Sequence, residues 1–431
     1  MDTPAAHALI RFGLGRRGGE PLPAAPHAWL ARQLEGPDPA FAAPCHSAAE
    51  GVLAIRAFNM RQVTGATDNP VREIFRADTA AAIETLLTTE SPFRERLVWF
   101  WANHFTVSTR RPLVAALVNS HIRDAIRPHV TGRFADMLHA VMRHPAMLFY
   151  LDNQASIGPD SQAGKRQRKG LNENLARECL ELHTVTPAAK YSQADVTAFA
   201  RVLTGWSIAY EPANNPGFIY RANAHEPGAQ IVMGQSWDGG EAAGLAALTW
   251  LGHHPATYHN IAIKLVRHFT ADTPAPAAVA AIETVLRRTD GDLKAASLAL
   301  LDLKEAWQPL TKLRTPFDYV LAVVRALDLP PGNRPDINAI MGGLGQSLHN
   351  APLPNGWSDV APDWAAPEAM LRRIDWAYAV AARTKALDPV ATAESSLGPL
   401  LPAATREQIA RAGSHREAMT LLLAAPEFQR R

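Results

Sequence analysis

The spacing of apolar residues is the feature that most restricts how this chain can fold. Alanine- and leucine-rich segments place apolar residues three and four positions apart from end to end, and alternating β-branched residues are scarce. The 431 residues are 47% hydrophobic and 19% charged, which is the balance of a folded globular protein. The sequence therefore predicts an all-α protein, a large multi-helix unit over residues 1–431.

Three segments carry signals for the start of a helix. Ser91 and Pro92 precede one apolar run, and Ser192 precedes another that stops at Gly205. Pro255 opens a third, with a histidine before it at the capping position. We expect helices to begin at these points.

Two stretches interrupt the helical pattern. Residues 207–240 lose the helical period and gain Pro, Gly, Asn and aromatic residues, which predicts a long loop or a small β-hairpin between possible halves 1–206 and 241–431. The stretch from Gly342 to Trp364 is irregular in the same way. Irregular stretches of this length in compact proteins are often functional.

Charge and cysteine content exclude several classes of protein. The net charge of +2 requires neither nucleic acid nor an anionic membrane as partner, and the basic run Gly164 to Gly170 is predicted to be a solvated loop. Cys45 and Cys179 cannot form a disulfide framework and match no zinc or redox motif. No apolar stretch is long enough for a signal peptide or a membrane span, so we expect a cytoplasmic protein.

The segment GLNENLARECLELHT, Gly170 to Thr184, places several polar residues in an otherwise apolar helix. On a helical wheel Asn174, Glu178 and Glu181 share one narrow face, and Arg177 lies at its edge. A helix that is apolar on most sides is expected to be buried. A buried carboxylate must then be paired, protonated or bound to a metal.

Three interpretations of this segment compete. In the first, Arg177 pairs with Glu181 and the other polar side chains hold neighbouring backbone. In the second, Glu178 and Glu181 bind a metal with His183 or His104, although the usual Glu-x-x-His spacing is not met. In the third, one carboxylate with a raised pKa acts as a general acid or base. The sequence leaves all three open.

Other polar residues stand in similarly apolar surroundings. His104 falls on the helical face of Trp101 and Phe105, and His144 and Asp152 flank an aromatic run. A single histidine on an apolar face is more often a hydrogen-bonded core residue than a ligand. Several such residues form a site only if the fold brings them together.

Distinctive motifs occur along nearly the whole chain: RFGLG (Arg11 to Gly15), RLVWFWANHFTVS, HPAMLFYLDN followed by SIGP, GLNENLARECLELHT, YSQADVTAFARVLTGW, KLRTPFDYVLAVVRAL, GQSLHNAPLPNGWSD and LLLAAPEFQRR. Together these motifs resemble a large bacterial family known as domain of unknown function 1800. The resemblance implies a mostly helical single unit in which the polar motifs gather, but it does not supply a reaction.

The resemblance also implies a partner. Members of this family are commonly encoded beside domain of unknown function 1501, which looks like a relative of sulfatases and often carries an export signal. This implies a sulfatase-like partner in an envelope or exopolysaccharide setting, and export together with that partner. The chain departs from the family pattern at His225, where HEPGAQ lacks the usual lysine, and after Thr184, where VTPAAK replaces a glycine-rich turn.

Two hypotheses for function follow. The first is a hydrolase of a glycan-like substrate, working with a divalent metal ion or by acid/base chemistry alone. The second is a non-catalytic helical scaffold that binds the sulfatase-like partner. Under the first hypothesis the catalytic residues are Glu178, Glu181, His104 and Asp152, the substrate-binding residues are Asn103, Asn172, Asn174, Arg177, Trp206 and Trp357, and the metal ligands are His183, His104, Glu178 and Glu181.

Overall fold

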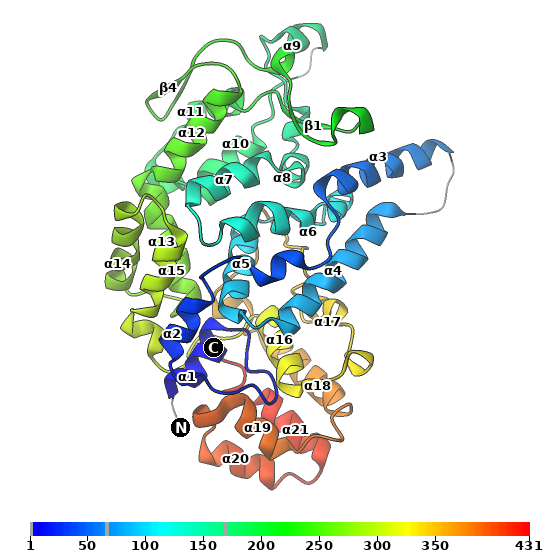
Figure 1. The fold of residues 1–431 in the computed structure, drawn as a ribbon, viewed down its shortest axis with the longest axis vertical. Coiled ribbons are helices and arrows are strands. Elements are labelled where there is room, and N and C mark those ends of the chain that lie inside the picture. Colours follow the sequence, from blue (N-terminus) through cyan, green and yellow to red (C-terminus); the bar gives the residue numbers. More distant parts are fainter. Residues whose placement is uncertain (1–2, 65–68, 168–169) are drawn as a thin grey trace.

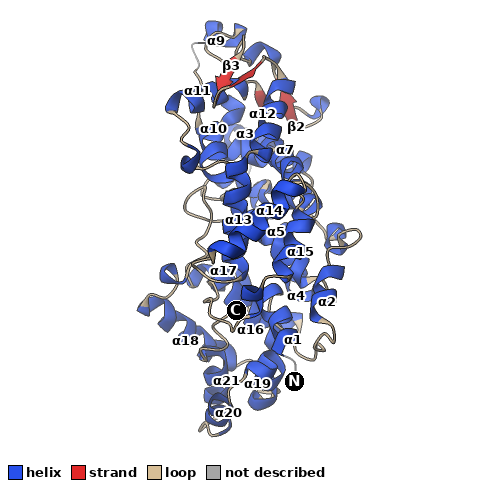
Figure 2. Cartoon of the chain, turned by 90° about the vertical axis from the view of Figure 1, so that its left-hand side faces the viewer, coloured by secondary structure: helices blue, strands red, loops and turns tan. Residues whose placement is uncertain are grey.

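The computed structural model describes residues 3–64, 69–167 and 170–431 and confirms the predicted all-α class. Within these residues, strands form only two small antiparallel sheets, and helices make up most of the rest. The molecule is elongated, with the strands at one end and α19 to α21 at the other (Figures 1 and 2).

The helices follow one another through the chain, and the longest connections lie between α11 and α12 and between α17 and α18. The α-helices are α1 (Thr3–His7), α2 (Pro26–Arg32), α3 (Ala48–Thr64), α4 (Pro70–Thr88), α5 (Pro92–His104), α6 (Val118–His121), α7 (Phe134–Arg143), α8 (Pro145–Tyr150), α9 (Gln162–Gln167), α10 (Asn174–Glu178), α11 (Gln193–Val202), α12 (Glu241–His253), α13 (Pro255–Phe269), α14 (Pro276–Arg288), α15 (Leu293–Leu301), α16 (Pro316–Leu327), α17 (Ile337–Gly343), α18 (Pro367–Ala381), α19 (Pro389–Leu397), α20 (Ala403–Ala410) and α21 (His415–Ala424). Three π turns are η1 (Ala8–Phe12), η4 (Ile122–Ile126) and η7 (Cys179–His183). The 3₁₀ turns are η2 (Pro39–Ala42), η3 (Pro112–Ala116), η5 (Arg127–His129), η6 (Asn153–Ala155), η8 (Pro187–Ala189), η9 (Pro212–Asn214), η10 (Ala222–Ala224), η11 (Lys304–Trp307), η12 (Pro331–Asn333), η13 (Ala361–Asp363) and η14 (Gly398–Leu400).

The predicted helix starts are confirmed. Helix α11 begins with a complete capping box, in which Ser192 and Asp195 each accept a hydrogen bond from the other's backbone N–H. At the start of α13 the ring of His254 accepts from the N–H of Ala256 at 3.1 Å. Helix α5 begins at Pro92 as expected, although Ser91 before it makes no capping bond with its side chain.

Residues 207–240 contain the predicted β structure, as two hairpins. Strands β1 (Trp206–Ala209) and β2 (Gly217–Tyr220) pair with Trp206 opposite Tyr220. Strands β3 (Gln230–Val232) and β4 (Gln235–Trp237) pair in a second hairpin. All four residues of β1 are buried, and β3 packs against α11. The insertion therefore belongs to the folded body.

The basic run at 164–170 is only partly the loop that was predicted. Lys165 and Arg166 lie in α9, and both are exposed. The expectation of solvation is confirmed for these two residues, whereas the expectation of a loop is wrong for them, because a helix forms up to Gln167. Residues 168–169 lie outside the described residues.

Two large apolar clusters form most of the core, and a third small one consists of Ile157, Ala163 and Ala224. The larger runs from Ala8 to Ala306 and includes residues on both sides of the 207–240 insertion. The smaller of the two large clusters is centred on α16 and α18 to α21, and it also takes four apolar side chains from the first 87 residues. The α1 helix packs against η14 near the other end of the sequence. A division into halves 1–206 and 241–431 stays a prediction. The larger apolar cluster continues across the 207–240 insertion as far as Ala306.

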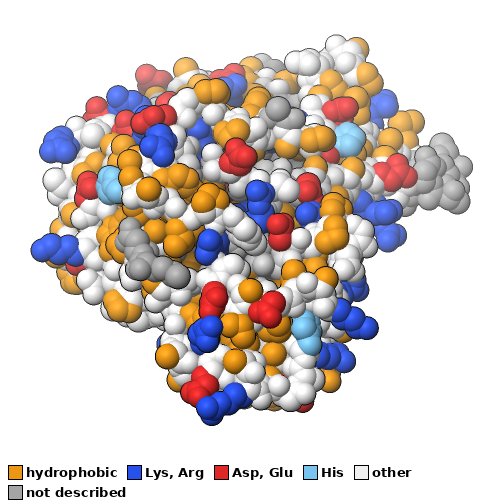
Figure 3. All heavy atoms as spheres, turned by 60° about the horizontal axis from the view of Figure 1, so that its bottom comes forward, with side chains coloured by type: hydrophobic (Ala, Val, Ile, Leu, Met, Phe, Trp, Pro, Cys, Tyr) orange, Lys and Arg blue, Asp and Glu red, His pale blue; other side chains and the backbone are white. Residues whose placement is uncertain are grey.

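The surface carries mixed charge where the C-terminal end of the molecule comes forward. On that face basic and acidic side chains are interspersed with hydrophobic ones (Figure 3). Among the described helices, none has both the length and the apolar character needed to cross a bilayer.

Candidate functional site

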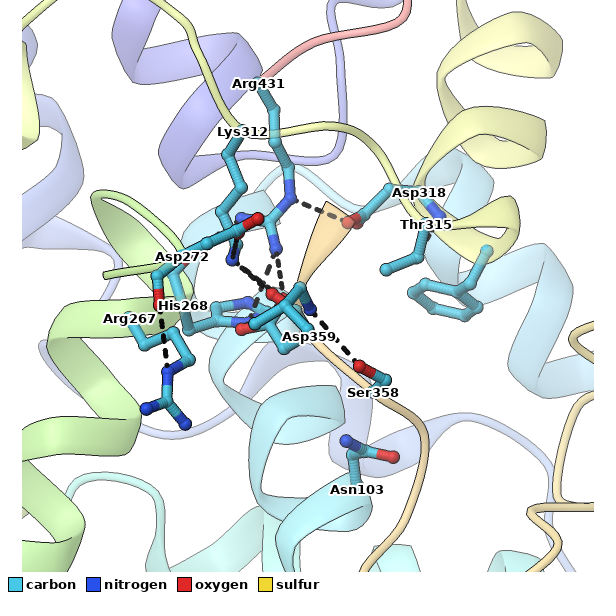
Figure 4. Close-up of polar contacts among 12 residues, drawn as sticks. Asn103, Arg267, His268, Asp272, Lys312, Thr315, Asp318, Ser358, Asp359 and Arg431 are labelled. Atoms are coloured by element: carbon cyan, nitrogen blue, oxygen red, sulfur yellow. Dashed lines mark hydrogen bonds and ion pairs between the residues drawn. The ribbon is translucent and has the colours of Figure 1, made fainter. Parts of the chain in front are cut away.

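A cavity of about 890 Å³ lies between α5, α13 and the irregular stretch 342–364. The start of α16 and the C-terminal arginine complete its walls (Figure 4). The second irregular stretch of the sequence is therefore one wall of a cavity whose size suits a small ligand. The polar and aromatic residues that line it include Arg96, Trp99, Asn103, His104, Glu181, Asn260, Lys264, Arg267, His268, Asp318, His349, Trp357, Asp359, Trp364 and Arg431.

Lys264 and His104 meet at the wall of this cavity. The Nζ of Lys264 lies 3.0 Å from Nδ1 of His104 and 3.3 Å from the carbonyl oxygen of Leu182. The Nε2 of His104 lies 3.2 Å from the carbonyl oxygen of His183. A carbonyl can only accept, so Nε2 carries the proton and Nδ1 accepts from the lysine.

Both groups are shifted toward their neutral forms. Burial, and next to it the charge of Arg267, lowers the pKa of Lys264 from 10.5 to about 8. Burial, together with the charge of Lys264, holds the pKa of His104 well below its usual range. Near neutral pH the site therefore has a neutral imidazole beside an amine that can lose its proton readily.

Lys264 and Arg267 form a cationic wall on one face of α13. Neither has an ion pair with any carboxylate of the described residues. The Nε of Arg267 donates to the carbonyl oxygen of Asp272 at 3.2 Å, and no partner within the described chain is bonded to its two terminal nitrogens. In Figure 4 this guanidinium lies apart from the group around Asp359.

A second set of charges beside the cavity is fully paired. This paired cluster consists of Arg96, Lys312, Asp318, Asp359 and Arg431. Asp318 lies 2.9 Å from Arg96 Nη1 and 2.7 Å from Arg431 Nε. Asp359 lies 3.1 Å from Arg431 Nη2 and 3.5 Å from Lys312 Nζ. Figure 4 shows Arg431 reaching both carboxylates, which joins the end of the chain to α16 and the 342–364 stretch.

The paired cluster keeps its carboxylates ionised despite burial. Burial opposes ionisation of Asp318, but the charges of Arg431 and Arg96 outweigh it and hold its pKa well below the usual range. The neighbouring His268 stays neutral, because burial lowers its pKa to about 4 even though Nδ1 lies 3.0 Å from Asp359. The ring of His268 is therefore neutral, and its Nδ1–H donates a hydrogen bond to the Asp359 carboxylate.

The amide of Asn103 holds the loop that carries Trp357. Its Nδ2 donates to the carbonyl oxygen of Trp357 at 2.9 Å, and its Oδ1 accepts from the Trp357 N–H at 2.7 Å. Gly356 has φ of 79°, and a Cβ there would lie 2.4 Å from the Asn103 carbonyl oxygen, so only glycine fits. Trp357 in turn lies 6.0 Å from Trp364, ring centre to ring centre.

The burial predicted for the carboxylates of 170–184 is wrong for Glu181 and holds in part for Glu178, whose pKa is raised by burial and by the charge of Glu181. Glu181 and Asn174 are exposed and Glu178 is half-buried, while Leu175 and Leu180 point into the core. The helix is solvated on its polar face and buried on its apolar face, as in an ordinary amphipathic helix. Glu181 lines the rim of the cavity, whereas Glu178 lies outside its lining.

Arg177 makes a different ion pair from the predicted one. Its Nη2 lies 2.8 Å from the carboxylate of Glu173, one turn earlier in the chain. The predicted pair with Glu181 does not form. Glu173 also accepts from Thr197 and Gln193 of α11. The reason is the π turn η7, which begins at Cys179 and ends the regular i, i+4 spacing before Glu181 is reached.

The four proposed metal ligands are not gathered around one point in the described structure, so a metal role for them stays a prediction. His183 is fully buried, its ring centre is 5.6 Å from that of His104, and neither of its nitrogens has a partner in the described part of the chain. Glu181 is exposed at the rim of the cavity, and Glu178 is half-buried outside its lining. Across the described ranges, no three His, Cys, Asp or Glu side chains are placed to hold a metal ion.

The remaining predicted residues lie outside the cavity lining. Asp152 has a left-handed backbone with φ of 60° and pairs with Arg111 at 2.5 Å. The Oδ1 of Asn172 accepts from the N–H of Asn174 at 2.8 Å, a local bond at the start of α10. Trp206 is fully buried, and its indole packs against Gly244. Roles for these residues in binding or catalysis stay predictions.

Sequence reasoning did not single out the residues that dominate the cavity. Lys264 and Arg267 are spaced as neighbours on one helical face in IKLVRHF, and this spacing was their only signal. Asp318, Asp359 and Arg431 lie in three motifs that carried the family resemblance, so their presence there could have pointed to them.

Comparison with known proteins gives one match. A family described as "Protein of unknown function (DUF1800)" matches residues 7–430, nearly the whole chain. Neither the curated proteins nor the solved structures gave a match. The resemblance that the motifs suggested is thereby confirmed, and the chain belongs to the DUF1800 family.

Proposed function

We propose that the protein is an enzyme that binds a glycan-like substrate in the cavity and hydrolyses it with Lys264 as the central acid/base group. The observation that carries this proposal is the 3.0 Å contact between Lys264 Nζ and His104 Nδ1 at the wall of a cavity of about 890 Å³. Titratable groups with shifted pKa values that face a cavity are typical of active sites, because proton transfer is fastest when the pKa is near the working pH.

Lys264 is suited to protonate a leaving group. With a pKa of about 8 it is mostly an ammonium at neutral pH, yet a stronger acid than an ordinary lysine. His104 and the carbonyl of Leu182 fix the position of Nζ. In hydrolysis Lys264 gives its proton to the glycosidic oxygen as the C–O bond breaks.

Glu181 is the group that we assign as the base. It lines the rim of the cavity, is exposed, and forms no ion pair with any described residue. A free carboxylate of this kind can take a proton from water as the water oxygen bonds to the sugar carbon. Glu178 lies outside the cavity lining and takes no part in this mechanism, so its predicted catalytic role stays a prediction.

A sugar ring fits the other walls of the cavity. Trp357 and Trp364 offer adjacent aromatic faces, with ring centres 6.0 Å apart. Aromatic walls with a few fixed polar groups are the usual lining of small-molecule sites. Trp99 and Phe100 of α5 add apolar surface to the lining.

The test is activity against a panel of oligosaccharides, with products detected by mass spectrometry. We expect Lys264→Met to lower kcat by about 10² to 10⁴, the usual contribution of a general acid, with a smaller change in KM. Lys264→Arg keeps the charge but cannot release the proton, so it should be equally slow. The exposed Lys304→Met is the matched control. Unchanged turnover in Lys264→Met would rule out the assigned role.

A second candidate function is a scaffold for the sulfatase-like partner of domain of unknown function 1501. The observation that favours it is an apolar face of α18, where Leu371, Ile374 and Tyr378 are 59%, 44% and 46% exposed. Their spacing of three and four places them on one side of the helix. Coexpression and affinity purification with that partner, with and without Ile374→Glu, tests it. Failure of the unaltered proteins to copurify would contradict the scaffold.

A further inference from the structure

We infer that the substrate of this cavity carries an oxyanion, and that Arg267 binds that group at the cationic wall. This inference rests on the proposed function and narrows its substrate class to acidic saccharides. It depends on how the charges that line the cavity are distributed, which differs sharply from one side to the other.

The buried carboxylates of the cavity are already neutralised, whereas the exposed Asp363 accepts from the Ser358 hydroxyl and has no ion pair in the described chain. Asp318 and Asp359 are held by Arg96, Arg431 and Lys312 at distances of 2.7 to 3.5 Å. They therefore have no attraction left for a cation. Glu181 lies at the exposed edge, where water screens its charge.

On the cationic wall the positive charges have no carboxylate partner in the described chain. Lys264 contacts only neutral groups, His104 Nδ1 and the Leu182 carbonyl. Arg267 uses its Nε on the Asp272 carbonyl, which leaves both terminal nitrogens facing away from the paired cluster (Figure 4). Two neighbouring half-buried cations without a counter-ion in the described chain are unfavourable, and an anion placed against them would remove that cost.

The geometry of Arg267 favours an oxyanion over other ligands. A guanidinium presents its terminal N–H groups as a planar fork, which matches the two oxygens of a carboxylate or a sulfate ester. Because Asp272 O fixes Nε, the fork is held in one orientation before the ligand arrives. Arg267 is a binding residue in this arrangement, and Lys264 remains available for proton transfer.

The experiment measures binding by calorimetry to three sets of oligosaccharides: uronate-containing, their carboxyl-reduced neutral counterparts, and sulfated. We expect acidic oligosaccharides to bind about tenfold to a hundredfold more tightly than neutral ones, the usual effect of a charge-assisted hydrogen bond. Arg267→Met should reduce the affinity to the neutral level, and Arg267→Lys should restore part of it. The exposed Arg288→Met on α14 removes the same charge outside the cavity and should have no effect.

The outcomes separate this inference from the function on which it rests. Preference for the uronate or for the sulfated set identifies the source of the oxyanion, and either supports the inference. Equal binding of acidic and neutral oligosaccharides, unaltered in Arg267→Met, overturns the inference while the cavity remains a saccharide site. Binding of none of the three sets overturns the proposed function itself. Circular dichroism of each variant checks that the fold is kept.

Discussion

Two groups of charged side chains border the same cavity and differ in how completely they are paired. In the paired cluster each carboxylate contacts two or more cationic groups, as Asp318 does with Arg96 and Arg431. On the cationic wall Lys264 and Arg267 contact only neutral acceptors. Lys264 and Arg267 are half-buried, so water replaces only part of the counter-charge that they lack.

The difference separates a structural role from a functional one. Buried charges that satisfy each other hold distant segments in one arrangement, and here they join α5, α16, the 342–364 stretch and the end of the chain. Cations that lack a counter-ion lower stability unless backbone carbonyls satisfy them, as they do for Arg11, and Lys264 and Arg267 differ from Arg11 because they face a cavity that can hold an anion. Mutations in the two groups should therefore change stability in opposite directions.

The largest effect is expected from breaking the paired cluster. Asp318→Asn removes the charge that Arg96 and Arg431 share, which leaves the buried Arg96 without an ion pair and Arg431 with Asp359 alone. We expect the free energy of unfolding to fall by about 3 to 5 kcal/mol. Urea unfolding followed by circular dichroism measures the loss. Asp375→Asn, on the exposed side of α18, should change stability by less than about 0.5 kcal/mol, and an equal loss in both variants would contradict the argument.

Lowering the pH should destabilise the protein in two stages, because buried neutral histidines and paired carboxylates lose their stabilising effect in different pH ranges. Burial lowers the pKa of His183 to about 3 and of His121 to about 4, so the unfolded chain takes up protons first as the pH falls below 6.5. Stability should therefore decline from about pH 6.5 downward, by at most about 1.4 kcal/mol per pH unit for each histidine. Asp318, whose pKa is depressed, adds its loss only below about pH 4.

Urea midpoints between pH 7 and pH 4.5 test this sequence of events. In His183→Leu the decline should be shallower, because one neutral buried ring is gone. A midpoint that stays constant down to pH 4.5 in the unaltered protein would show that the histidines are not held neutral.

The fold could be predicted further from the sequence than the site could. Helical period and caps are local properties, so the starts of α5, α11 and α13 followed from a few residues each. The pairing of Asp318 with Arg431 joins positions 113 apart in the sequence, and nothing local indicates which arginine is the partner. The burial of Glu181 was mispredicted since the apolar residues beside it cover only the inner face of its helix.

Replacing Lys312 and replacing Lys264, two lysines near the cavity, should change stability in opposite directions at pH 7. Lys312, in the paired cluster, is 2% exposed and lies 2.8 Å from Asp272, so Lys312→Met should lower stability by about 1 to 3 kcal/mol. Lys264 has a folded pKa of about 8 against 10.5 unfolded, so the unaltered protein should gain stability as the pH rises between these values. Lys264→Met should remove that gain and raise stability at pH 7. Urea midpoints at pH 7, 8.5 and 10 separate the two variants, and a loss of stability in Lys264→Met at pH 7 would contradict the proposed imbalance.

The smallest effect is expected on the outer face of α10, where two glutamates should again differ in sign. Glu173 pairs with Arg177 at 2.8 Å, so Glu173→Gln should cost about 0.3 to 0.5 kcal/mol. Burial and the neighbouring charge of Glu181 raise the pKa of Glu178, so its stabilising influence is present in acid and is lost as the pH rises through the raised value. At pH 7 Glu178→Gln should therefore add a few tenths of a kcal/mol, because solvent screens most of the repulsion, and at pH 4 the gain should vanish. A loss of several kcal/mol in Glu178→Gln at pH 7 would instead place Glu178 in a buried network and make it comparable to Asp318.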